Sequence, residues 1–262
     1  MDEAVAEKAP AATLYLIRHG ETEVNRRNCV QGKRIDPPLN ERGRRQAGCV
    51  GERFRSQSVD WIVTSAALRA IETGAAIGRH HPAVPIDSYS ELNELEFGDL
   101  EGTHVTAGYN DLVALWDNEH RADLAAPGAH GESPAQCAQR AMPRLQAIVK
   151  QAAAEGRRTV CVVVHSRLIQ ILLAQILDGS LATMRTYKQK KAAVNTVDIY
   201  VDANAEHWPF RCVAREINST AHMPDDVVSR VSSATSLQRR SRLDERVRFE
   251  IDNDGSLVLK RL

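Results

Sequence analysis

TLYLIRHGET, residues 13–22, is the stretch from which the expected fold is worked out. Its first five residues form an apolar run with the length of a buried strand, and the run stops at Arg18, His19 and Gly20. Functional residues are often carried on a loop that follows a rigid element. The stretch therefore predicts a first strand that delivers an arginine and a histidine to such a loop.

Helical and strand-like segments alternate after this stretch. Strands that alternate with helices predict a three-layer α/β/α sandwich with a mostly parallel central sheet. The last two strands are expected to form an antiparallel pair. The expected elements are a helix at residues 40–54, a strand at 60–64, a helix at 66–78, a weak strand at 85–90, a helix at 133–154, a central strand at 159–164, a helix at 168–177, and strands at 196–201 and 211–216.

Two of the expected strands end at a histidine, since the strongly β-branched run at 159–164 is followed directly by His165. Open parallel sheets bind ligands beyond the carboxyl ends of their strands, which is where both His19 and His165 fall. The sequence thus predicts one site that holds both histidines.

One main domain is expected, because 262 residues are ample for a single α/β core. Residues 1–12 are interpreted as a polar leader, 13–223 as the catalytic domain and 224–262 as a C-terminal extension. Two strand-like runs at 247–251 and 256–259 flank the turn sequence DNDG, so a terminal hairpin is expected that docks onto the main domain.

Composition excludes several classes of function. The 34 basic and 34 acidic residues balance, which argues against binding of nucleic acid or of an anionic membrane surface. Five scattered cysteines fit neither a zinc cluster nor a disulfide framework, so we expect no metal, no other cofactor and a reducing compartment. Without an apolar run long enough to span a bilayer, the chain is interpreted as soluble and cytoplasmic. The oligomeric state is left open.

The residues at the end of the first strand can carry phosphoryl chemistry. A neutral imidazole such as that of His19 can attack phosphorus, while the Arg18 guanidinium neutralises phosphate oxygens and lowers the proton affinity of the imidazole. Gly20 allows a close approach of the backbone. An arginine and a histidine at a strand end also occur as an ordinary surface pair, so this motif needs corroboration elsewhere in the chain.

Corroboration comes from four separated motifs that together resemble the histidine phosphatase, or phosphoglycerate mutase-like, superfamily. The resemblance covers about residues 13–223 and implies a metal-independent phosphomonoester hydrolase that forms a phosphohistidine. It also implies the phosphoglycerate mutase-like fold. The motifs are RHGET at 18–22 with Asn25, TSAALRA at 64–70, ELNELEFGDLEG at 91–102 and VVHS at 163–166.

The resemblance implies a role for each matching residue. His19 would be the nucleophile and Glu94 the proton donor, with Glu91 and Glu96 as competing candidates for the acid. Arg18, Arg69 and His165 would bind the phosphoryl group, His165 as a cationic imidazole. Substrate-binding residues are expected at Asn25, Gln31, Gly32 and Ser166, where Ser166 departs from the glycine that is common in relatives. Val24 likewise stands where tryptophan is frequent.

Two alternatives to hydrolysis remain open, phosphoglycerate mutase-type transfer and an inactive binding module of the same fold. Hydrolysis is favoured because the segment 102–131 is short and contains a single Arg or Lys residue, Arg121. The expected partner is a small phosphorylated substrate. A second anionic group on it could be held by the basic cluster that follows the nucleophile, which could equally be a solvated loop. This cluster comprises Arg26, Arg27, Lys33 and Arg34.

Overall fold

The computed structural model describes residues 9–118, 120–201, 210–228, 247–251 and 257–261. Its main sheet has six strands in the order β3-β2-β4-β1-β5-β6. The strands are β1 (Ala12–Arg18), β2 (Trp61–Ser65), β3 (Ile86–Tyr89), β4 (Thr159–Val164), β5 (Val194–Val201) and β6 (Phe210–Ser219). The α-helices are α1 (Glu23–Arg26), α2 (Glu41–Phe54), α3 (Leu68–Gly78), α4 (Ala107–Asn118), α5 (Pro134–Ala154) and α6 (Ser166–Leu173).

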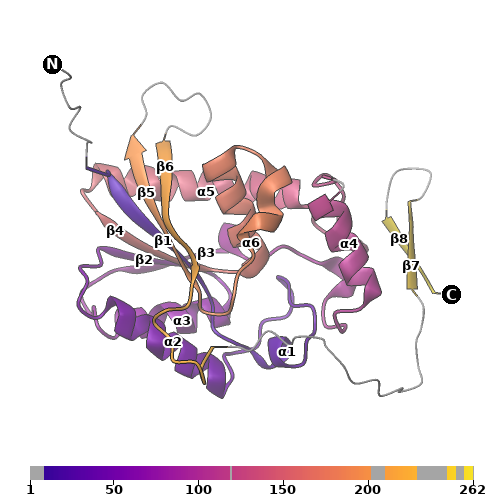
Figure 1. Ribbon diagram of the computed structural model, residues 1–262, viewed down its shortest axis with the longest axis horizontal. Coiled ribbons are helices and arrows are strands. Elements are labelled where there is room, and N and C mark those ends of the chain that lie inside the picture. The colour runs from indigo at the N-terminus through magenta and orange to yellow at the C-terminus, as the bar shows by residue number, and fades with distance from the viewer. Residues whose placement is uncertain (1–8, 119, 202–209, 229–246, 252–256, 262) are drawn as a thin grey trace.

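The three-layer prediction is confirmed. Helices α2 and α3 cover one face of the sheet, and α5 and α6 cover the other (Figure 1). Strands β3, β2, β4 and β1 run parallel, while β5 pairs antiparallel with both β1 and β6. The sheet is therefore mixed, and the expected antiparallel pair forms its edge at β5 and β6.

Strand β4 illustrates why the layers form. Val160, Val162 and Val164 belong to the core cluster beneath α5 and α6, whereas Cys161 and Val163 belong to the cluster beneath α2 and α3. Alternate side chains of a strand point to opposite faces, so an unbroken apolar run is the pattern of a strand covered on both sides. This run lies between β2 and β1, at the interior position expected for it.

Capping residues begin the helices near the positions that the sequence predicts. The Ser133 hydroxyl accepts from the backbone N–H of Gln136, whose side chain accepts from the N–H of Ser133, and Pro134 fills the first turn of α5. Helix α6 begins two residues earlier than expected, directly after His165, and continues into a π-turn that Gly179 ends with φ 66°.

Several elements were not predicted, among them the short helix α1 and two longer segments. Helix α4 occupies part of the segment 102–131, and a 3₁₀ segment at Leu181–Tyr187 precedes β5. The last pair of strands, β7 (Val247–Ile251) and β8 (Leu257–Arg261), is antiparallel, and β7 contacts α4 (Figure 1). The DNDG turn between them and residues 1–8 of the leader lie outside the described residues. In the described part of the chain, no helix has the length and apolar character needed to cross a membrane.

Candidate active site

The carboxyl ends of β1 and β4 bring the two predicted histidines together. Arg18 lies opposite Val164 in the parallel pair, and the backbone N–H of His19 donates to the Val164 carbonyl at 3.0 Å. The next residue of β4 is His165, so the two rings lie with their centroids 5.2 Å apart. The structure therefore places both histidines at one site, where the two strand ends meet.

The tautomer of His19 follows from its hydrogen bond. Its Nδ1 lies 2.7 Å from the Gly20 carbonyl oxygen, which can only accept, so Nδ1 carries the proton and Nε2 keeps its lone pair. Burial lowers the pKa of His19 well below 6.5, and the charges of Arg69 and Arg18 lower it further. His19 is therefore a neutral imidazole with a free Nε2 at neutral pH.

Close packing holds the turn after His19 in place. A Cβ atom on Gly20 would lie 2.5 Å from the carbonyl oxygen of Gly43, so only glycine fits against α2 here. The Gly20 N–H also donates to the Thr73 hydroxyl at 3.1 Å. The loop that carries His19 is thereby fixed against both α2 and α3.

Two arginines flank His19. Arg69, from the first turn of α3, is fully buried and donates to Asp36 Oδ1 at 3.1 Å and to the Gly32 carbonyl at 3.1 Å. Arg18 donates through Nη1 to the Gln189 carbonyl at 2.6 Å. These bonds hold each guanidinium in one orientation before any ligand binds.

Within the described part of the chain, three nitrogen atoms at this site are buried without a hydrogen-bond partner. They are Arg18 Nε, Arg69 Nε and His165 Nδ1. An unsatisfied buried polar group costs roughly 1–3 kcal/mol, and such groups in native structures require an explanation. An anion bound beside His19 would satisfy them.

The expectation of a cationic His165 is wrong for this state of the site. Burial lowers its pKa well below 6.5, and the nearby charge of Arg69 adds to the effect. His165 Nε2 lies 2.7 Å from the Ser65 hydroxyl oxygen, which already accepts from the Ala67 N–H. In the tautomer in which the Ser65 hydroxyl donates to Nε2, the proton of the neutral ring lies on Nδ1, the unpartnered atom, where it can be donated to an anion.

Glu94 is the carboxylate that lines the pocket beside this cluster. Its Oε1 accepts from the N–H groups of Leu95 and Leu168, each at 3.0 Å, and its Oε2 accepts from the Arg167 N–H at 3.1 Å. The last two donors belong to the N-terminus of α6, a favourable place for an anionic group. Oε2 accepts from one backbone N–H group and Oε1 from two, so Oε2 is the freer oxygen.

The two competing acids lie elsewhere. Glu91 is bound by Arg144, and Glu96 lies 3.4 Å from Lys33. Neither is among the residues that line the pocket. The geometry therefore favours Glu94 as the acid group of this site.

Arg140 of α5 holds the loop that presents Glu94. It donates to the carbonyls of Glu91, Asn93 and Glu94 at 2.7–3.0 Å, and it binds both oxygens of Glu132. Glu132 in turn accepts from the Glu96 N–H at 3.2 Å. The Arg140 guanidinium thus holds the acidic loop at the backbone carbonyls of Glu91, Asn93 and Glu94.

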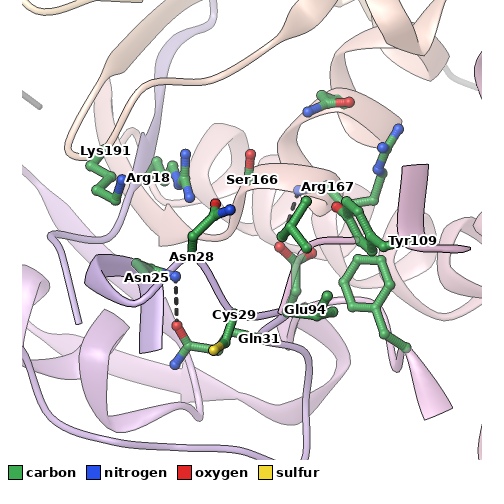
Figure 2. A pocket seen from close by; sticks show the side chains of 14 residues that line it. Arg18, Asn25, Asn28, Cys29, Gln31, Glu94, Tyr109, Ser166, Arg167 and Lys191 are labelled. Atoms are coloured by element: carbon green, nitrogen blue, oxygen red, sulfur yellow. Dashed lines mark hydrogen bonds between the residues drawn. The ribbon is translucent and has the colours of Figure 1, made fainter. Parts of the chain in front are cut away.

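A pocket of about 200 Å³ is lined by Arg18 and Glu94 together with residues from several other elements (Figure 2). We call His19, Arg18, Arg69 and His165 the pocket floor; of these Arg18 lines the pocket, while the other three are buried and do not line it. We call the other residues that line it, apart from Glu94, the pocket wall. The wall comprises Asn25, Asn28, Cys29, Val30, Gln31, Phe97, Val105, Tyr109, Ser166, Arg167, Gln170 and Lys191.

Most of the predicted site residues meet at this pocket. Asn25, Gln31 and Ser166 belong to the wall, where Gln31 Oε1 accepts from Asn25 Nδ2 at 2.9 Å. Gly32 does not line the pocket; its carbonyl supports Arg69, and a Cβ atom there would clash with Glu101. The role expected for Gly32 in substrate binding is thus replaced by a structural one.

The basic cluster after the nucleophile does not reach the pocket. Arg26 and Arg27 pair with Glu23 on the surface, with side chains 61% and 66% exposed. Neither Lys33 nor Arg34 lines the pocket. The solvated-loop interpretation of this cluster fits the structure better.

Several wall residues were missed by sequence reasoning, among them Asn28, Tyr109, Arg167, Gln170 and Lys191. The spacing of Ser166, Arg167 and Gln170 on one face of a helix could have indicated two of them. For Lys191 and Tyr109 no comparable signal exists. Within the described residues, no group of three or more His, Cys, Asp or Glu side chains is arranged to hold a metal ion.

A mixed sheet between two helical layers, with histidines at two neighbouring strand ends, defines the phosphoglycerate mutase-like class. The solved structure of a phosphoglycerate mutase from Bacillus anthracis matches with a TM-score of 0.67 at 21% identity, over 80% of this chain and 94% of that one. The model of the histidine phosphatase superfamily (branch 1) matches residues 14–209. The chain belongs to this superfamily.

Curated relatives include proteins named as phosphatases. A glucosyl-3-phosphoglycerate phosphatase of Mycolicibacterium vanbaalenii is 33% identical over 171 residues, which are 63% of this chain and 73% of that protein. A probable phosphatase of Schizosaccharomyces pombe is 40% identical over 92 residues, which are 35% of this chain and 44% of that protein.

Proposed function

We propose that this protein is a metal-independent phosphomonoester hydrolase that acts on a small phosphorylated metabolite through a phosphohistidine on His19. The observation that carries the proposal is the set of three buried, unpartnered donors beside a neutral imidazole. Donors placed in advance where charge develops stabilise a transition state without reorganisation. The family membership and the phosphatase relatives support the same chemistry.

The first step transfers the phosphoryl group to the protein. The lone pair on His19 Nε2 forms a bond to phosphorus, while the bond from phosphorus to the ester oxygen breaks. The leaving oxygen takes a proton from Glu94, through the freer oxygen Oε2. Arg18, Arg69 and His165 Nδ1 donate to the three non-bridging oxygens.

The second step regenerates the enzyme with water. The Glu94 carboxylate now takes a proton from a water molecule, whose oxygen attacks phosphorus as the bond to Nε2 breaks. Inorganic phosphate leaves, and Glu94 is again protonated. The same carboxyl group therefore acts as acid in one step and as base in the other.

Hydrolysis is proposed in preference to a mutase reaction. Among the described residues of the segment 102–131, Val105 and Tyr109 line the pocket, whereas Arg121, the single Arg or Lys of this segment, does not. A mutase must retain a bisphosphate while it turns over. A wall with few cations on this side favours release of the dephosphorylated product.

A rapid-quench experiment tests the proposal. The enzyme is mixed with labelled phosphomonoester substrates in excess chelator and quenched in alkali or in acid. We expect label on the protein that survives alkali and is released by acid, together with turnover. Direct transfer of the label to water, or activity that needs added magnesium or zinc, would overturn it.

A further inference from the structure

Lys191 is a cation on the pocket wall that the proposed mechanism does not use. It lies in the loop before β5 and lines the pocket beside Arg18, across from Glu94 and Tyr109 (Figure 2). Its side chain is 20% exposed, so a ligand in the pocket can reach it. This position calls for a separate account of what Lys191 binds.

Among the described residues that line the pocket, Arg18, Arg167 and Lys191 are cations, and they differ in how they are paired. Arg167 is bound to Asp117 at 2.8 Å, with both side chains almost fully buried, so its charge is compensated within the protein. Arg18 belongs to the pocket floor, which we propose binds the phosphoryl group. Lys191 has Glu21 Oε2 at 3.8 Å, which is longer than a hydrogen bond. The Lys191 ammonium is therefore the wall cation with capacity for a further anion.

The transferring phosphoryl group does not need this charge. Its three non-bridging oxygens already match the three unpartnered donors of the floor, which are more deeply buried than Lys191. An ammonium that is partly exposed on the wall faces the remainder of the substrate instead. A flexible lysine suits a carboxylate or a second phosphate, because it acts as a point charge and imposes no fork geometry.

Asn28 adds a second polar group on the wall. Its backbone is held at φ 54°, a left-handed conformation that asparagine tolerates better than most residues, and its side chain lines the same pocket (Figure 2). Non-glycine residues in this conformation occur often at ligand-binding sites. The amide can donate to an anion that Lys191 neutralises.

We propose that Lys191, together with Asn28, forms a subsite for a second anionic group of the substrate, either a carboxylate or a second phosphate. This inference rests on the proposed phosphatase function and adds the substrate class. It replaces the basic cluster after the nucleophile, which does not line the pocket, as the source of charge for such a group. The natural substrate is then a phosphomonoester that carries another negative charge close to the ester.

Matched substrate pairs test this subsite. O-phosphoserine and O-phosphoethanolamine differ by one carboxylate, and propanediol bisphosphate and propanediol monophosphate differ by one phosphate. We expect the wild type to favour the more anionic member of at least one pair. Lys191→Met should reduce kcat/KM for that member by about 10- to 100-fold and should leave the other member nearly unchanged. Lys191→Arg should restore much of the loss.

Lys190→Met is the matched control, because Lys190 is exposed and does not line the pocket. A loss confined to the first pair identifies a carboxylate subsite, and one confined to the second identifies a phosphate subsite. The subsite would be overturned if the wild type showed no preference within either pair. It would also be overturned if Lys191→Met lost kcat/KM equally for both members of a pair and was inhibited more weakly by vanadate. Failure of the wild type to hydrolyse any monoester, an aryl phosphate included, would instead overturn the proposed function.

Discussion

The pocket floor and the pocket wall are built in different ways. The floor residues come from the ends of β1 and β4 and from the first turn of α3. His19, Arg69 and His165 are buried, and all four side chains are held by protein hydrogen bonds. The wall residues come from loops, from α1, from α4 and from the first turns of α6, and several are partly exposed. The difference suggests that the floor carries the chemistry and the wall the choice of substrate.

The largest expected effect is on the floor, at His19. His19→Asn removes the nucleophile, so kcat should fall by about 10⁴-fold or more, and alkali-stable label on the protein should disappear. His130→Asn is the matched control, since His130 is exposed and lies outside the pocket. Label retained in His19→Asn would assign the phosphohistidine to another residue.

The floor was predictable because it depends on strand ends and short motifs. An apolar run that alternates between two core clusters marks β4 as an interior strand, and parallel pairing then forces His19 and His165 to the same edge. The charge state of His165 was not predictable in this way. It follows from complete burial and from the nearby charge of Arg69, both of which depend on packing.

The wall was largely unpredictable. Lys191 reaches the pocket only because the chain returns beside β1 as β5, and the sequence pattern does not specify where the preceding loop lies. Helix α4 carries Leu112, Leu115 and Trp116 at helical spacing and follows Thr106, a residue type that often caps helices, so its existence could have been predicted. The position of Tyr109 over the pocket depends on how α4 packs, which is a tertiary property.

The second prediction concerns Glu94, which borders both floor and wall. Glu94→Gln should reduce kcat/KM by about 10²- to 10⁴-fold for an alkyl phosphate, because the alkoxide needs a proton, and much less for an activated aryl phosphate. The comparison uses kcat/KM because this ratio reports the steps through phosphorylation. Glu96→Gln is the matched control. Equal losses for both substrates would reassign Glu94 to binding or folding.

The third prediction separates charge from geometry at Arg69. Arg69→Met and Arg69→Lys should both lower kcat/KM by about 10²- to 10³-fold, since each removes the guanidinium fork on the phosphoryl group. The two should differ in pH dependence. Arg69 lowers the pKa of His19, so loss of its charge raises that pKa, and Arg69→Lys keeps the charge.

The fall of kcat/KM at low pH, its acid limb, reports the pKa of His19. In the wild type His19 stays neutral well below pH 6.5, so the limb that it causes lies below that pH. In Arg69→Met the limb should move to higher pH, while in Arg69→Lys it should stay near the wild-type position. Coincident limbs in the two variants would show that the Arg69 charge does not set the state of His19.

The smallest expected effect is on the wall, at Tyr109. Its ring lies 5.6 Å from that of Phe97, on the Glu94 side of the pocket (Figure 2). A wall residue contacts the leaving group, which has departed once the phosphohistidine has formed. Tyr109→Leu should therefore slow phosphorylation roughly three- to tenfold, through the lost aromatic contact, and leave hydrolysis of the phosphoenzyme unchanged.

Single-turnover mixing followed by a chase measures the two rates separately. Tyr109→Phe keeps the ring and serves as the control, with the midpoint of thermal unfolding recorded for both variants to exclude a folding defect. If Tyr109→Leu slows both steps equally, as a floor variant would, the division between floor and wall fails at this residue.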